Sequence, residues 1–148
     1  QPFYGRDSVV RWRPFRNNEP LGSVRVLAMF DWFKTDHASV HLITDAEAPQ
    51  AVDAVMHIGW DDGVMVWLNG EMVFDRRTYP ERGKGAFFKD RYDFEESVPI
   101  RLREGSNRFA ITDINQAGLW SVNFRVTDKD GWPLEGVAFT IPGCSKAK

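Results

Sequence analysis

Aromatic, amide, carboxylate and guanidinium side chains recur in the segments that separate the apolar runs of this chain. Aromatic rings present flat apolar faces that suit the C–H side of a sugar ring, and planar polar groups hydrogen-bond its hydroxyls. The candidate ring residues are Trp120, Trp60 and Tyr79, and the candidate polar residues are Asn115, Gln116, Asp113, Arg76 and Arg77. This set predicts a saccharide-binding site. The alternative for Trp120 and Trp60 is that their rings pack at the edge of a core.

Paired carboxylates stand at Asp61 and Asp62, directly before Gly63. Such a pair, together with loop carbonyl oxygens, suits calcium, a hard cation that takes about 6–8 oxygen ligands. The other interpretation is that both carboxylates only build the turn, by accepting hydrogen bonds from nearby backbone N–H groups. No further acidic or Asn-rich loop with clear calcium spacing follows in the sequence. Both interpretations stay open, and no cofactor is required.

Motifs for catalysis are absent from the sequence. The histidines are His37, His41 and His57, and their spacing is not that of a zinc site. There is no G-x-S-x-G nucleophile motif, and Cys144 lies in the tail. The carboxylates of residues 93–96 would have to pair with Asp61 or Asp62 for glycoside hydrolysis, and nothing in the sequence sets their separation. We therefore expect a non-catalytic protein, with a small glycan-active enzyme as an alternative.

The segment Ala51–Phe74 is the most regular part of the sequence. Apolar residues alternate with other residues up to Ile58, which is typical of a strand with one buried face. The continuous apolar run Val64–Leu68 predicts a strand that is buried on both faces. Asn69 and Gly70 then predict a type I′ hairpin, because both central residues of that turn need positive φ. The segment is interpreted as three strands joined by two turns.

Further strands follow from the same alternation and from Gly-containing turns. They are expected at Ser23–Phe33, Ala38–Thr44, Val98–Leu102, Asn107–Asp113, Leu119–Thr127 and Val137–Ile141. The third and fourth of these should form a hairpin across Glu104 and Gly105. Trp32 and Trp67 lie mid-strand and are expected in the core, whereas Trp132 would cover a sheet edge. No stretch shows helical periodicity, so the expected fold class is all-β, an antiparallel β-sandwich of the jelly-roll type.

The strand count predicts where the candidate residues gather. If successive strands run antiparallel, alternate connections fall at the same end of the sandwich. The connections 60–63, 76–97 and 114–118 then share one end, which is where the candidate binding residues lie. The connection 76–97 is also basic, which suits either contact with an acidic ligand or a solvated loop.

Length and composition limit the remaining possibilities. The chain has 148 residues, 43% of them hydrophobic, which indicates one domain, with residues 1–22 as an irregular lead-in containing an edge strand and residues 142–148 as a polar tail. A net charge of −2 gives no reason to expect a nucleic acid or an anionic membrane as partner. No apolar run approaches the roughly 20 residues of a membrane span. The chain begins at Gln1 without a signal peptide, so we expect a module or mature fragment of a longer protein.

Two hairpin-like motifs resemble a known group of domains. Residues 67–70 (WLNG) and 102–111 (LREGSNRFAI) resemble the galactose-binding-like jelly-roll domains attached to carbohydrate-active enzymes. Residues 61–63 (DDG) and the segment from Trp120 to Gly131 are similar to a subgroup found in large bacterial polysaccharide-degrading enzymes. The resemblance implies a non-catalytic carbohydrate-binding module of a secreted or cell-surface enzyme. Its partners would be a polysaccharide or oligosaccharide and the catalytic domain of the same parent chain.

The same DDG triplet also resembles the anthrax-protective-antigen-type domain. In adhesin members of that family the Asp pair holds a calcium ion that in turn holds a sugar, so the resemblance implies metal ligation by Asp61 and Asp62. A third interpretation is a structural accessory domain that packs on a catalytic domain and binds no glycan. A sugar binder should expose Trp or Tyr rings at the loop end, whereas a spacer should expose an apolar patch on a sheet face.

Overall fold

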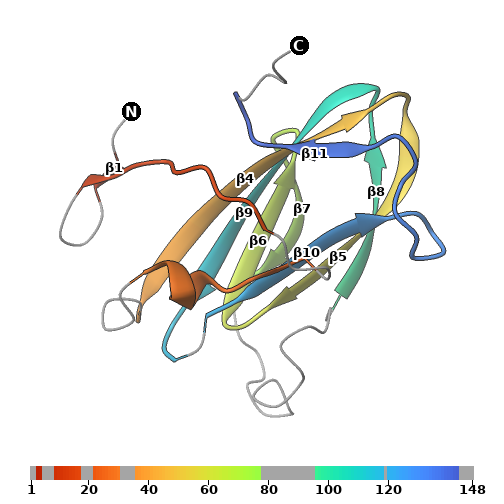
Figure 1. Ribbon diagram of the computed structural model, residues 1–148. Coiled ribbons are helices and arrows are strands. Elements are labelled where there is room, and N and C mark those ends of the chain that lie inside the picture. The colour runs from red at the N-terminus through yellow and green to blue at the C-terminus, as the bar shows by residue number, and fades with distance from the viewer. Residues whose placement is uncertain are drawn as a thin grey trace.

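The computed structural model describes residues 3–4, 9–17, 22–30, 36–77, 96–118 and 120–143. Most of these residues belong to two antiparallel sheets packed face to face (Figure 1). The elements are β1 (Phe3–Tyr4), β2 (Val9–Val10), β3 (Ser23–Val24), the 3-10 helix η1 (Val26–Met29), β4 (Ala38–Ala48), β5 (Val52–Trp60), β6 (Gly63–Leu68), β7 (Glu71–Arg76), β8 (Glu96–Leu102), β9 (Gly105–Asn115), β10 (Val122–Thr127) and β11 (Ala138–Thr140). The predicted class, an all-β antiparallel sandwich, is confirmed.

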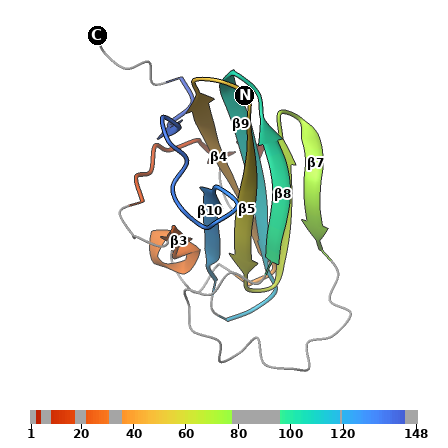
Figure 2. The same cartoon turned by 90° about the vertical axis from the view of Figure 1, so that its right-hand side faces the viewer.

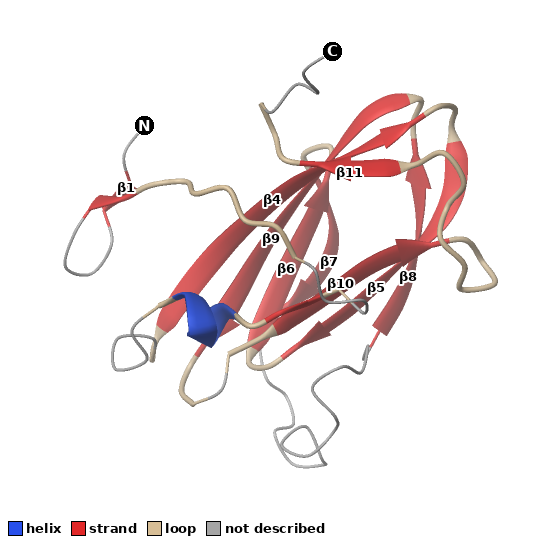
Figure 3. Cartoon of the chain, viewed as in Figure 1, coloured by secondary structure: helices blue, strands red, loops and turns tan. Residues whose placement is uncertain are grey.

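One sheet has five strands in the order β11-β4-β9-β6-β7, and the other has four in the order β3-β10-β5-β8. The short strands β1 and β2 pair with each other. Figure 2 shows the sandwich from the side, with β5, β8 and β10 in one layer and β4, β7 and β9 in the other. Figure 3 shows how little of the chain outside these strands is helical. None of the helices among the described residues has the length and apolar character that a membrane crossing would require.

Most chain reversals cross from one sheet to the other. The predicted hairpin of Val98–Leu102 with Asn107–Asp113 is wrong, because β8 pairs with β5 whereas β9 pairs with β4 and β6. Gly105 does reverse the chain, with a φ of 84°, but the strands on either side of it join different sheets. A glycine turn therefore shows that the chain reverses but not which strands pair. The sheet that each strand joins is set by the burial of the strand's apolar face.

The turn at Asn69 and Gly70 is the hairpin that the sequence predicted. Their φ angles are 55° and 87°, and β6 pairs with β7 on either side of them. The prediction that β6 is buried on both faces is wrong. Val64, Val66 and Leu68 are buried, whereas Met65 and Trp67 lie on the outer face and are partly exposed. Trp67 is therefore not a core residue.

The core lies between the two sheets and is built from alternate residues of each strand. Phe109 of β9 and Phe124 of β10 meet edge to face across the layers, with ring centroids 5.1 Å apart. The fully buried apolar side chains among the described residues include Phe109, Met56, Ile58, Leu102, Val26, Val64, Val66 and Val122. Burial of such side chains supplies about 1.5–3 kcal/mol each and drives the two sheets together.

The long strand predicted at Ser23–Phe33 is also wrong over its described part. Only Ser23 and Val24 pair with β10, and the chain then turns into η1. The N–H of Leu27 donates to the carbonyl oxygen of Trp120 at 3.2 Å, and Val26 is fully buried at this end of the core. The burial of Val26 at the end of the core therefore outweighs the alternation of apolar residues that predicted a strand here. Trp32 lies outside the described residues. Strand β4 begins at Ala38 as predicted but continues beyond Thr44 to Ala48.

Candidate functional site

The predicted meeting of distant connections at one end of the sandwich is confirmed for the described residues. We call this end, made of residues 36–37, 60–63, 76–77 and 115–118, the Asp62 end; it is the lower end in Figure 2. Strand register sets Gly63 opposite Ile114, Ala38 opposite Asn115, and Trp60 opposite Val122. Tyr79 lies outside the described residues.

Asp62 ties two of these connections together. Its carboxylate is buried, and Oδ2 accepts the backbone N–H groups of Gln116 and, at 3.2 Å, of Ala117. Asp36 holds the same loop from the other side by accepting the N–H of Gly118 at 3.2 Å. Asp62 does accept backbone N–H groups, as the turn-building interpretation expected, but the donors belong to a loop 54 residues further along the chain, so its carboxylate joins two connections.

Asp113 is a buried acid in the interior of this end. Its exposed fraction is 0%, and neither carboxylate oxygen has a hydrogen-bond partner of normal geometry among the described residues. Burial raises the pKa of Asp113 well above its usual value, and the nearby charges of Asp61 and Asp62 raise it further. The Trp120 side chain and the N–H of Ile114 favour the charged form in part, but burial outweighs them. Asp113 is therefore held in its neutral, protonated form over a wider pH range than an exposed aspartate.

Three of the predicted binding residues turn out to be structural. Trp120 is 4% exposed and stacks on Phe30, with ring centroids 6.3 Å apart and 23° between the planes. The prediction that Trp120 offers a ring to a sugar is wrong, and the alternative, packing at the core end, is what the structure has. Asn115 and Asp113 are fully buried on β9, so they face the core and do not reach a ligand at the surface.

The exposed members of the predicted set form a polar rim. Gln116, Arg76 and Arg77 are exposed, and Asp61 and Trp60 are partly exposed. Trp60 packs edge to face on Phe74, with centroids 5.5 Å apart, so one part of its ring belongs to the core edge, as the alternative interpretation predicted.

Both arginines of this rim already have acidic partners. Arg76 lies over the Phe74 ring, 4.9 Å from its centroid, and its Nη2 is 3.3 Å from Glu96 Oε1. Arg77 holds Asp75 through two of its nitrogens, at 3.0 and 2.6 Å, and this hydrogen bonding lowers the pKa of Asp75. These contacts fix the two guanidinium groups in place. A guanidinium carries five N–H donors, so each retains donors that a ligand can use.

The fit of a calcium ion to the Asp pair is poor. No three histidine, cysteine, aspartate or glutamate side chains converge into a metal-holding group within the described segments. Oδ2 of Asp62 is already engaged by two backbone N–H donors, which occupy lone pairs that a cation would need. The interpretation of Asp61 and Asp62 as a metal cage has no further support from their surroundings.

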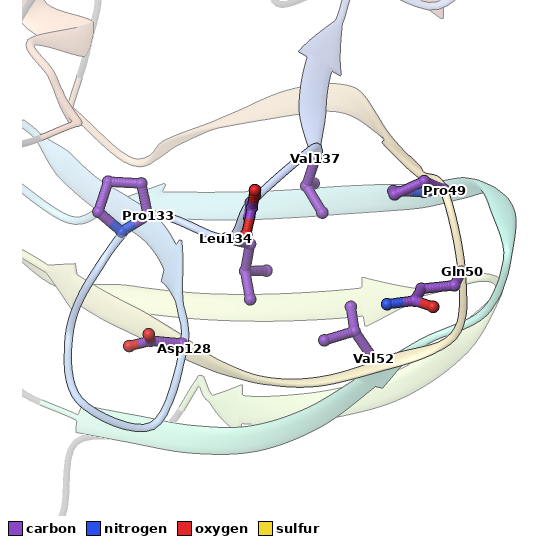
Figure 4. Close-up of a pocket in the computed structure, with 8 residues that line it drawn as sticks. Pro49, Gln50, Val52, Asp128, Pro133, Leu134 and Val137 are labelled. Atoms are coloured by element: carbon purple, nitrogen blue, oxygen red, sulfur yellow. The ribbon is translucent and has the colours of Figure 1, made fainter.

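Two surface features were missed by the sequence reasoning. Trp132, expected to cover a sheet edge, is 70% exposed and directly precedes Pro133, which lines a cavity at the opposite end of the sandwich (Figure 4). The second feature is a row of apolar side chains across the outer face of the five-stranded sheet. Its members, Ile43, Ala110, Trp67 and Met72, are neighbours in the strand register. The signal for this row was present in the sequence as apolar residues at outward positions, but outward could be assigned only from the register.

Comparison with known proteins adds information about the fold. No family model matches the chain, and no curated protein matches it. A crystal structure of selenomethionine-labelled beta-glucosidase from Kluyveromyces marxianus has a similar fold, with a TM-score of 0.55 and 17% sequence identity. The match covers 77% of this chain and 15% of the glucosidase chain, so this chain spans a small part of that protein's length. The fold and the likeness together define an antiparallel β-sandwich.

Proposed function

We propose that this protein is a non-catalytic carbohydrate-binding module that holds a larger secreted or cell-surface bacterial enzyme on polysaccharide. The observation that carries the proposal is the Asp62 tie, which joins the 60–63 and 115–118 connections into one polar end. A loop that is already ordered before binding loses little conformational entropy when a ligand arrives. This saving in entropy matters most for weakly bound ligands such as single saccharide chains, because it is a large share of their small binding free energy.

The exposed groups of the Asp62 end suit a hydroxyl-rich ligand. The Gln116 amide offers both a donor and an acceptor, and the Asp61 carboxylate accepts hydrogen bonds. Arg76 and Arg77 add donors that would also favour an acidic polysaccharide. The partly exposed edge of Trp60 gives an apolar contact beside them. Calcium is not required for these contacts.

The fold comparison supports the context of the proposal. A sandwich of this shape makes up 15% of a chain described as a beta-glucosidase, so the fold occurs as a small part of a carbohydrate-active protein. A catalytic domain in the same parent chain is therefore the proposed partner of this module.

Affinity gel electrophoresis on neutral and acidic polysaccharides, with and without a chelator, tests the proposal. We expect retardation on at least one polysaccharide, unchanged by the chelator, and a loss of about tenfold in affinity for Arg76→Ala combined with Gln116→Ala. Arg101→Ala is the control, because Arg101 is an exposed arginine paired with Asp53 and lies outside the Asp62 end. Equal loss in the control, or no retardation on any polysaccharide, contradicts the proposal. Retardation that the chelator abolishes would instead show that polysaccharide binding needs a metal ion such as calcium.

A structural accessory domain is the second candidate, and the apolar row on the five-stranded sheet favours it. Ile43 and Met72 are 36% and 44% exposed, and Trp67 and Ala110 between them are partly exposed. A contiguous apolar strip on a sheet face suits packing against another domain. Oxidative footprinting of Met72 tests this candidate: protection in the full-length parent enzyme, compared with the isolated module, supports it. Equal oxidation of Met72 in both contradicts it.

A further inference from the structure

Trp132 stands in a loop whose backbone is held firmly by its own hydrogen bonds. The N–H of Asp128 donates to the carbonyl oxygen of Trp132 at 2.8 Å, and the N–H of Trp132 donates to Oδ1 of Asp128 at 2.8 Å. The same Oδ1 accepts the N–H of Asp130 at 2.9 Å, and Arg125 donates to the carbonyl oxygen of Gly131 at 2.7 Å. The backbone of Trp132 is therefore fixed, whereas its indole is the most exposed of the large apolar side chains described.

A cavity of about 370 Å³ lies beside this loop, at the end of the sandwich opposite the Asp62 end. The residues that line it are Pro49, Gln50, Val52, Asp128, Pro133, Leu134, Glu135 and Val137. In Figure 4 the side chains of Val52, Leu134 and Val137 project into the space, and the Gln50 amide faces it from the loop between β4 and β5. The volume falls at the lower end of the range of about 300–1,000 Å³ that small-ligand sites occupy.

The chemistry of the lining selects among ligands. Apolar side chains form one wall, and the Gln50 amide and the Glu135 carboxylate supply a donor and acceptors for hydroxyl groups. None of the described residues that line the cavity is cationic, and the nearby Lys129 ammonium is paired with Asp130 at 2.7 Å. An anionic ligand would therefore meet two carboxylates and no cation in the lining itself, whereas a neutral saccharide meets matched partners.

We propose that this cavity and the Trp132 indole form a second saccharide site, which takes a neutral sugar unit. The C–H face of the sugar packs on the indole and the apolar wall, and its hydroxyls bind Gln50 and Glu135. The site shares its ligand class with the proposed function of the Asp62 end but none of its residues. Val52, which lines the cavity, and Trp60, at the Asp62 end, are the first and last residues of β5, so the two sites are separated by roughly 26 Å along that strand. The module then binds two polysaccharide chains, or two separated points of one chain, which raises its avidity.

Titration of the ¹⁵N-labelled module with soluble tetrasaccharides tests the site. The probes are the tetramers of β-1,4-linked glucose, mannose and xylose, with a galacturonate tetramer as the acidic comparison. We expect at least one neutral probe to shift the indole N–H signal of Trp132, with the acidic probe binding at least tenfold more weakly there. Trp132→Ala and Gln50→Ala should each weaken this binding about tenfold. Trp12→Ala is the control, because Trp12 is also exposed but lies in the lead-in segment.

The outcomes separate this site from the Asp62 end. Binding that Trp132→Ala weakens and Arg76→Ala leaves intact supports the second site, whatever the fate of the proposed function. Binding lost only in Arg76→Ala overturns the second site and leaves the Asp62 end standing. No shift of the Trp132 signal with any neutral probe also overturns it. A Trp132 signal that moves with protein concentration and not with sugar overturns it in favour of contact between two copies of this chain.

Discussion

The buried carboxylate of Asp62 holds the backbone of Gln116, so a residue of the β5–β6 turn fixes the loop that follows β9. The acceptor and the donor of this hydrogen bond come from segments that are far apart in the chain. This contact holds the 60–63 and 115–118 connections in a fixed position relative to each other. The proposed saccharide site depends on that arrangement, because it takes side chains from both connections.

Asp62→Ala tests the tie directly. The substitution leaves the N–H groups of Gln116 and Ala117 without their acceptor, and we expect a loss of about 2–3 kcal/mol in the free energy of unfolding. Urea unfolding followed by fluorescence measures it. Asp53→Ala is the matched control, because its ion pair with Arg101 is exposed and should contribute less than about 1 kcal/mol. Similar losses in both variants would mean that the tie adds nothing.

Asp113 should make the protein more stable in acid. Its pKa is raised in the folded state, so from about pH 4 upward the unfolded chain ionises this group while the folded protein keeps it protonated. The stability that Asp113 contributes is complete below about pH 4 and is lost as the pH rises through the folded pKa, at up to about 1.4 kcal/mol per pH unit. Asp113→Asn removes this dependence. Its stability relative to the unaltered protein should therefore grow as the pH rises, measured as urea midpoints between pH 3 and 8. Two parallel curves would show that Asp113 ionises normally.

The ion pair of Asp45 and Arg108 should have the opposite pH dependence. Arg108 donates to both carboxylate oxygens, at 2.8 and 2.9 Å, and this hydrogen bonding lowers the pKa of Asp45. The stabilisation is present above about pH 4 and disappears as the pH falls through the lowered pKa. Arg108→Ala should cost about 1 kcal/mol at pH 7, a modest figure because the guanidinium is largely solvent-exposed, and less at pH 2. A loss of equal size at both pH values would indicate packing by the arginine stem instead.

Asn107 should be the most sensitive polar residue at the opposite end. Its Oδ1 accepts the N–H of Arg103 at 2.9 Å and the side-chain amide of Asn69 at 3.1 Å, and its Nδ2 donates to the carbonyl oxygens of Arg103 and Gly105. Asn107→Ala leaves several buried groups unpaired and should cost about 3 kcal/mol. Amide exchange at Arg103 should accelerate in the variant. The neighbouring exposed Ser106 gives the control, Ser106→Ala, and an Asn107 variant as stable as this control would contradict the network.

Gly70→Ala isolates the backbone requirement of the β6–β7 hairpin. Gly70 has a φ of 87°, and an added Cβ would meet no atom within 4 Å, so any loss reflects conformation and not a clash. We expect a loss of about 1 kcal/mol or more, seen as a lower thermal midpoint. A replacement by D-alanine, which favours positive φ, should restore the midpoint. An unchanged midpoint in the L-alanine variant would show that the turn relaxes freely.

The sequence by itself determined the fold class, most of the strands from Ala38 onward, and the end at which distant connections meet. Alternation of apolar residues along β5, the Asn69–Gly70 pair and the number of chain reversals are local properties, so they can be read without knowing which strands pair. The candidate residues of the Asp62 end were found on this basis, and Gln116, Arg76 and Arg77 are exposed there.

Only the tertiary structure decided which sheet each strand joins and which side chains the core takes. Trp120 and Asp113 follow the same local pattern as exposed residues would, but the closing of the sandwich buries both, and Phe30 covers the Trp120 ring. The Asp62 carboxylate accepts the N–H of Gln116, a residue 54 positions further along the chain. Trp67 lies opposite Ala110 on the outer face of the sheet, a position that only the strand register sets. These outcomes depend on contacts between segments distant in sequence. Burial and pairing free energies add up over the whole molecule, and no short stretch of sequence contains them.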